Sequence, residues 1–171
     1  YESATKAYEK LYALEHDNPD VITMLLQLYG TQSNYDKMIE MLDRLETVQG
    51  YSDRIALTKM QVYEQQGKKK EQEGVLKAMI AKYPNDPNYK VMYCNWLMHN
   101  GRPKDGGKLL SQILKDDPTN VSARLAMLDY YASQGKEDEL RKLTESLLMS
   151  KEITQQTKTA MLRQVIIDNE Q

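Results

Sequence analysis

The sequence predicts an all-α protein built from stacked pairs of antiparallel helices. The interval between Pro84 and Pro118 recurs from Gly67 to Gly101 and again from Gly101 to Gly135, and we call it the repeat period. Between these residues, the apolar positions follow the spacing of one helix face. A fixed period of about 34 residues is typical of repeat proteins, in which each helix pair buries its apolar side against its neighbours.

The expected helices follow one another as this period requires. The first covers residues 1–15 and ends before Asn18-Pro19-Asp20, where a capping side chain and a proline suit a new helix start. The next helix runs to a turn at residues 30–34. Its partner begins at Tyr35 and ends at Gly50, a residue that tolerates positive φ. The remaining pairs turn near Gly67, Gly101 and Gly135, and a last helix holds Met161 to Ile167.

The composition excludes several classes of protein. Of the 171 residues, 40% are hydrophobic and 28% charged, as in ordinary globular proteins. The apolar runs are far shorter than the roughly 18 residues that cross a bilayer, so we expect no direct membrane insertion. A formal charge of −2 gives no field that favours nucleic acid. Residue 1 is Tyr without a leader, so we expect a segment of a longer or processed chain.

Few residues could carry chemistry. His16 and His99 are the only histidines, and Cys94, five positions before His99, does not share a helix face with it as metal ligands would. No phosphate-binding loop, HExxH or GxSxG motif is present. We therefore expect a non-catalytic protein without a metal or cofactor. We also expect Cys94 to be a buried small hydrophobe and Trp96 to pack between helices.

These residues resemble the pattern of the tetratricopeptide repeat (TPR) family. That pattern has Tyr late in the first helix, Gly in the turn and Pro at the end of the second helix. The three columns read Tyr29, Tyr63, Leu97, Tyr131; then Ser33, Gly67, Gly101, Gly135; then Gly50, Pro84, Pro118, Glu152. The resemblance implies a right-handed α-α superhelix, a single TPR solenoid. It would contain the second helix of a partial repeat (1–18), four full repeats (19–52, 53–86, 87–120, 121–154) and a final helix (155–171).

The chain also departs from the family pattern. Lys59 stands at a Leu position and Gln72 at an Ala position. Gly106 and Gly107 lie inside an expected helix, where each glycine costs roughly 1 kcal/mol relative to alanine. A close helix crossing accounts for Gly106, but the sequence offers no reason for Gly107.

Three segments, residues 42–57, 83–91 and 157–163, are similar to parts of long bacterial envelope repeat proteins that carry an export signal. That likeness implies a periplasmic or envelope-associated location.

The family resemblance assigns the outward side of each first helix to a concave lining. The lining positions are Thr23, Gln27, Leu57, Gln61, Val91, Asn95, Met98, Leu125 and Asp129. Leu57, Val91 and Leu125 recur with the repeat period, forming an apolar ladder that could bind an extended or helical peptide. The Lys, Asn and Arg clamp of chaperone-tail binders is missing. If the ladder is a groove, Leu57→Asp with Val91→Asp should abolish binding and leave folding intact; if it is core, the double variant should unfold.

The sequence therefore favours a non-catalytic scaffold that binds a peptide or partner protein on its concave face. The partner's identity is open. The alternative is a structural spacer or self-associating segment, with ends at Ala4/Tyr8 and Met161/Val165 that stack on further repeats. A regulatory arm of a distant catalytic domain is a third option.

Overall fold

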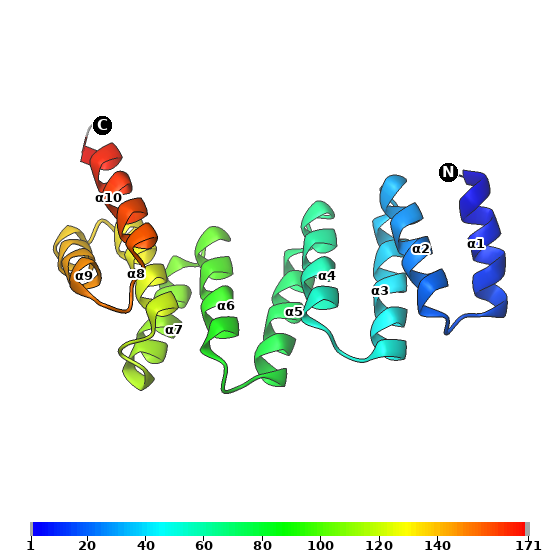
Figure 1. Cartoon of the computed structure of the whole chain (residues 1–171), viewed down its shortest axis with the longest axis horizontal. Coiled ribbons are helices and arrows are strands. Elements are labelled where there is room, and N and C mark those ends of the chain that lie inside the picture. Colours follow the sequence, from blue (N-terminus) through cyan, green and yellow to red (C-terminus); the bar gives the residue numbers. More distant parts are fainter. Residues whose placement is uncertain (1, 170–171) are drawn as a thin grey trace. The chain divides into compact units, whose positions relative to one another are not determined.

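The computed structural model describes the backbone of residues 2–169 and the side chains of residues 2–163. Within these residues it contains ten α-helices and no strand, which confirms the all-α prediction (Figure 1). The helices form two compact units, Tyr1–Lys82 (unit 1) and Tyr83–Gln171 (unit 2). The boundaries of the repeats stay a prediction.

Unit 1 contains five helices, and each packs against the next one in the chain. They are α1 (Glu2–Leu14), α2 (Pro19–Thr31), α3 (Tyr35–Gln49), α4 (Asp53–Gln65) and α5 (Lys69–Lys82). Tyr29 links α2 to α1, because its hydroxyl donates to a carboxylate oxygen of Glu9 at 2.8 Å. Burial and this bond raise the pKa of Tyr29.

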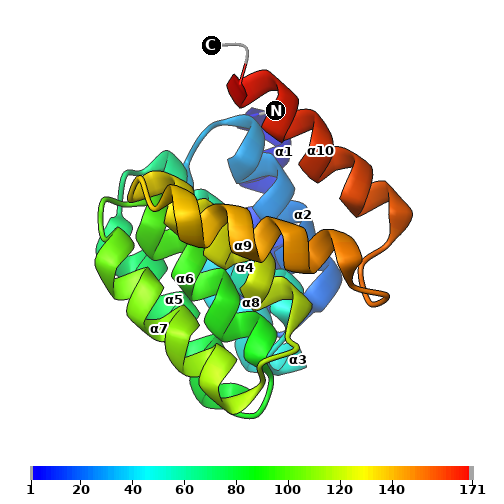
Figure 2. The same cartoon turned by 90° about the vertical axis from the view of Figure 1, so that its left-hand side faces the viewer.

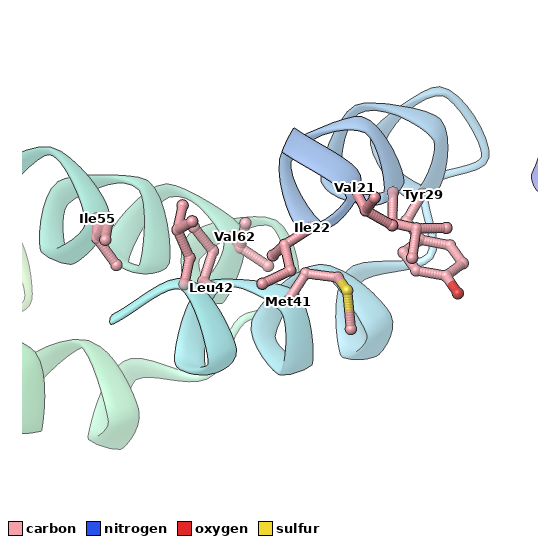
Figure 3. Close-up of a cluster of buried hydrophobic side chains, with 9 residues drawn as sticks. Val21, Ile22, Tyr29, Met41, Leu42, Ile55 and Val62 are labelled. Atoms are coloured by element: carbon pink, nitrogen blue, oxygen red, sulfur yellow. The ribbon is translucent and has the colours of Figure 1, made fainter. Parts of the chain in front are cut away.

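The core of unit 1 is formed by apolar side chains from three successive helices. Figure 3 shows Val21, Ile22 and Tyr29 of α2 beside Met41 and Leu42 of α3, with side chains of α4 completing the cluster. Ile22 and Leu25 are fully buried. One helix pair alone could not cover this surface, so the pairs stabilise one another.

Unit 2 contains the other five helices. They are α6 (Pro87–His99), α7 (Pro103–Asp116), α8 (Val121–Ser133), α9 (Glu137–Met149) and α10 (Gln155–Asn169). Helix α8 packs against α6, α7 and α9, and α10 packs against α9. Figure 2 shows α6, α7 and α8 lying side by side. Their core includes Val91, Cys94, Leu110 and Met127.

The turns within the four helix pairs share one backbone conformation. Ser33, Gly67, Gly101 and Gly135 have φ values of 53°, 67°, 77° and 64°. In each turn, the N–H of the residue that follows donates to a carbonyl in the last turn of the helix, at Tyr29, Tyr63, Leu97 or Tyr131, over 2.9–3.0 Å. This is the hydrogen bond that closes a helix with a left-handed residue. The Tyr and turn columns of the sequence therefore mark the helix ends.

Helices α2 and α6 begin with the same combination of a capping side chain and a proline. Asn18 caps α2 and Asp86 caps α6: their side chains accept from the backbone N–H two residues on, at 3.0 and 2.9 Å. Pro19 and Pro87 follow directly, where a missing N–H does no harm.

Lys59 and Gln72, which depart from the repeat pattern, both make polar contacts between helices. The Lys59 ammonium is largely buried and pairs with Asp43 of α3, at 2.8 Å, and with Glu46. Burial alone lowers the pKa of Lys59, but the two carboxylates outweigh it and raise that pKa. The amide of Gln72 on α5 donates to the Met60 carbonyl of α4 at 3.0 Å. Both polar side chains are therefore satisfied where apolar ones would otherwise fit.

The structure gives a physical reason for Gly107, which the sequence alone does not. A Cβ atom at this position would overlap the ring of Tyr130 on α8. A Cβ at Gly106 would lie 2.9 Å from the Cys94 carbonyl oxygen and 3.0 Å from Cγ of Met98, both on α6. The two glycines therefore allow α7 to approach two different helices.

Candidate functional site

Unit 2 has a pocket of about 660 Å³ on its α6 and α8 helices. The lining residues come from four helices: Asn88, Val91, Met92 and Asn95 of α6; Ser122, Leu125, Ala126, Leu128, Asp129 and Ala132 of α8; Leu140 and Thr144 of α9; and Met161 of α10. Most of these side chains are apolar. A pocket of this size and character is typical of a ligand-binding site.

The helical period explains why α6 and α8 line the pocket together. Val91 and Asn95 lie one turn apart on α6, as do Leu125 and Asp129 on α8, so each pair shares a helix face. The two pairs stand one repeat period apart, at equivalent positions of helices that pack against each other. The repeat therefore produces one surface from four separate residues.

These four residues are predicted lining positions that the structure brings together. Met98, the fifth position predicted in unit 2, is not among the pocket residues and packs against the core. Asn88 and Ser122 were missed, although they are also one repeat period apart and lie one turn before Val91 and Leu125. The lining residues of α9 and α10 cannot be found from the repeat period, because only the tertiary packing brings those helices to the pocket.

The other predicted positions belong to unit 1 and do not line this pocket. Thr23 on α2 is half-buried, while Gln27 on α2 and Gln61 on α4 are exposed. Leu57 on α4 is 40% exposed.

The proposed apolar ladder is not uniform. Val91 is only 7% exposed and belongs to the core of unit 2, although it also borders the pocket. An aspartate there would be buried with its charge, so Leu57→Asp combined with Val91→Asp would not leave folding intact. Of the two outcomes set out for this double variant, the burial of Val91 favours unfolding, and the assignment of the ladder as a groove stays a prediction.

The polar side chains of the pocket, Asn88, Asn95, Ser122, Asp129 and Thr144, offer both hydrogen-bond donors and acceptors. Asn95 Oδ1 is buried and has no hydrogen-bond partner among the described residues. The surrounding protein desolvates Asp129 and raises the pKa of its carboxyl, although the residue as a whole remains exposed and nearby His99 opposes the shift. His99 Nδ1 lies 2.7 Å from the backbone carbonyl of Asn95.

The described residues contain no group of three His, Cys, Asp or Glu side chains that could hold a metal ion. None of the described helices is long and apolar enough to cross a membrane.

Trp96 is half-buried and stacks on Tyr93 of the same helix, with ring centroids 6.2 Å apart.

The ends predicted to stack on further repeats are only partly available. Ala4 is exposed, but Tyr8 is half-buried against the core of unit 1. Met161 borders the pocket of unit 2. The side chain of Val165 lies outside the described residues.

Cys94 is fully buried, as the sequence predicts, and burial raises the pKa of its thiol from 9.0 to about 12. We expect a maleimide at pH 8 to label the folded protein very slowly and the urea-unfolded protein within minutes. Since the folded state holds this proton more tightly, its contribution to stability is complete below pH 9 and is lost towards pH 12. Rapid labelling of the folded protein would contradict the burial. Mass spectrometry reports on this one thiol alone, because the chain has a single cysteine.

Helix pairs of this kind, with left-handed turn residues that recur at the repeat period, have the fold of TPR-type repeat proteins. Solved structures confirm this fold. A tetratricopeptide repeat protein from Parabacteroides merdae superposes with a TM-score of 0.59 at 14% identity, over 85% of this chain and 58% of that one. MamA superposes with a TM-score of 0.57 at 14% identity, over 99% of this chain and 91% of that one.

YrrB, described as a TPR protein with an unusual peptide-binding site, gives a TM-score of 0.53 at 14% identity, over 84% of this chain and 74% of that one. No family model matches the sequence, and no curated protein matches it significantly. The chain spans 58% of the Parabacteroides merdae protein's length. The comparisons therefore show the fold.

Proposed function

We propose that this chain is a non-catalytic protein–protein interaction scaffold, and that unit 2 binds a peptide segment of a partner protein in its pocket. The observation that carries the proposal is the buried Asn95 Oδ1, which has no partner among the described residues. A buried acceptor without a hydrogen bond is unfavourable, by about 1–3 kcal/mol. Asn95 lines the pocket, so a rotation of its side chain would bring this oxygen to a donor of a bound ligand and remove that penalty.

A peptide suits the rest of the pocket. Leu125, Leu128 and Met161 offer apolar surface for a side chain, and methionine adapts to different shapes. The acceptors of Asn95 and Asp129 can receive N–H groups, which every peptide backbone supplies. YrrB provides an analogy at the level of the fold, since it has a peptide-binding site on the same architecture. The envelope-associated location stays a prediction.

Methionine methyl groups provide a site-specific test of binding. We would label the methionines with ¹³C and add pools of capped random nonapeptides. We expect shifts at Met92 and Met161, which line the pocket, and none at the buried Met41 and Met79 of unit 1. Pools that shift no methionine, or that shift Met41 and Met79 equally, would overturn the proposal.

Two matched variants locate the binding surface. Leu125→Gln removes apolar lining from the pocket, and we expect about ten-fold weaker binding. Leu57→Gln makes the same change at the equivalent position of the ladder in unit 1, outside the pocket, and should leave affinity unchanged. If both variants lose the same amount of binding affinity, the site is not confined to unit 2.

Self-association is a second candidate, because α1 exposes two leucines. Leu14 is 82% and Leu11 is 36% exposed. Association through this surface predicts light scattering that grows with concentration and is reduced by Leu14→Lys. A monomer at every concentration would exclude it.

A further inference from the structure

We infer that the pocket of unit 2 selects a peptide in which a lysine or arginine accompanies an apolar side chain. The inference rests on the proposed function and names the chemistry of the partner. It follows from the signs and types of the polar groups that line the pocket.

Asp129 is the one ionisable side chain among the described lining residues. No lysine, arginine or histidine is part of that lining. Arg124, also on α8, donates from Nη2 to Ser146 Oγ of α9 at 2.7 Å. The pocket therefore presents a negative charge without a cation in its lining, and His99, which acts on Asp129, is the basic side chain nearby.

Two of the lining residues carry acceptors that could bind such a basic group. Asn95 Oδ1 is a buried acceptor without a partner among the described residues, and Asp129 adds a carboxylate. The Thr144 hydroxyl, a donor in the lining, already donates to the Leu140 carbonyl at 2.8 Å. The Asn88, Asn95 and Ser122 side chains also carry donors, which the carbonyl groups of a peptide can satisfy. Ammonium and guanidinium groups carry several donors and no acceptor, so they complement the Asp129 carboxylate and the Asn95 oxygen. A ligand carboxylate would meet Asp129 as a like charge.

The apolar walls suit the remainder of a basic side chain. Lysine and arginine carry long aliphatic stems that pack on apolar surface while the charged head reaches a polar group. Val91, Met92 and Leu125 can contact such a stem, with Asp129 one turn beyond Leu125 on α8. The desolvation that disfavours the Asp129 carboxylate would be offset by an approaching positive charge.

Positional pools of capped nonapeptides test the inference. Each pool fixes lysine, uncharged norleucine or glutamate at one position and randomises the others. The methyl shifts of Met92 and Met161 measure binding. We expect the best lysine pool to bind about five-fold more tightly than its norleucine counterpart, and glutamate more weakly than both. Added salt should reduce the lysine advantage and leave norleucine binding nearly unchanged.

Three variants assign the effect to Asp129. Asp129→Asn should remove the lysine advantage and keep norleucine binding, while Asp129→Glu should retain the advantage. Asp116→Asn removes the same charge from an exposed position on α7 outside the pocket, and should change neither. Circular dichroism verifies that each variant is folded.

The outcomes separate the two proposals. If norleucine and lysine pools bind equally well, the peptide-binding proposal stands and the preference for a basic residue is overturned. If the lysine advantage survives in folded Asp129→Asn, the inference is also overturned. If no pool shifts Met92 or Met161, both proposals fail.

Discussion

Replacing Val91 with aspartate is expected to unfold unit 2, whereas Leu57→Asp should leave the fold intact. Val91 is 7% exposed within the core formed by α6, α7 and α8, and Leu57 is 40% exposed on α4. An unpaired carboxylate in a core is unfavourable by several kcal/mol, a large fraction of a typical stability of about 5–15 kcal/mol. Urea unfolding followed by circular dichroism measures both variants.

Val91→Thr is the matched control, because threonine has nearly the same shape as valine without a charge. The free energy of unfolding that Val91→Thr loses should lie between the losses of Val91→Asp and Leu57→Asp. If Val91→Asp and Leu57→Asp lose similarly small amounts of unfolding free energy, Val91 lies on the surface. The apolar ladder could then form a groove.

Alanine at Gly106 is expected to destabilise unit 2 by about 1–3 kcal/mol, the usual range for overpacking. The new Cβ would lie 2.9 Å from the Cys94 carbonyl oxygen, and a backbone atom of α6 cannot move aside without moving its helix. Gly74→Ala is the control. Gly74 lies in α5 with nothing within 4 Å of a Cβ, so this change should stabilise by about 0.5–1 kcal/mol.

Gly107 allows a finer version of this experiment. Its Cβ would overlap a side-chain ring rather than backbone, so removal of that ring should relieve the overlap. We expect Gly107→Ala to be less damaging in a Tyr130→Ala background than alone. If the losses of unfolding free energy are additive in a double-mutant cycle, the two residues do not interact.

For Gly106, a stabilising effect of Gly106→Ala would contradict the close approach of α7 to α6.

Local patterns were sufficient for the helices and their turns. The columns at Tyr29 and Ser33 recur through the chain, and the structure places a helix end and a positive φ at each repeat. Asn18-Pro19 and Asp86-Pro87 likewise mark helix starts through contacts between near neighbours in the chain. Such features depend on adjacent sequence, so one sequence suffices to predict them.

Contacts between helices were harder to predict. Lys59 and Gln72 looked like defects of the pattern, because their partners lie on other helices. Gly107 had no visible reason, because Tyr130 meets it from α8. Periodicity identifies which residues share a face, but it does not say which atoms of another helix will occupy the opposing space.

The amino-acid sequence by itself determined the all-α class, the repeat period, the turns and part of one helical lining. The tertiary structure decided which of those residues form a pocket. It placed Val91 in the core, grouped Asn95, Leu125 and Asp129, and added Thr144 and Met161 from later helices. The physical reason is that helix periodicity is local, whereas burial and an unpartnered acceptor such as Asn95 Oδ1 depend on the packing of several helices.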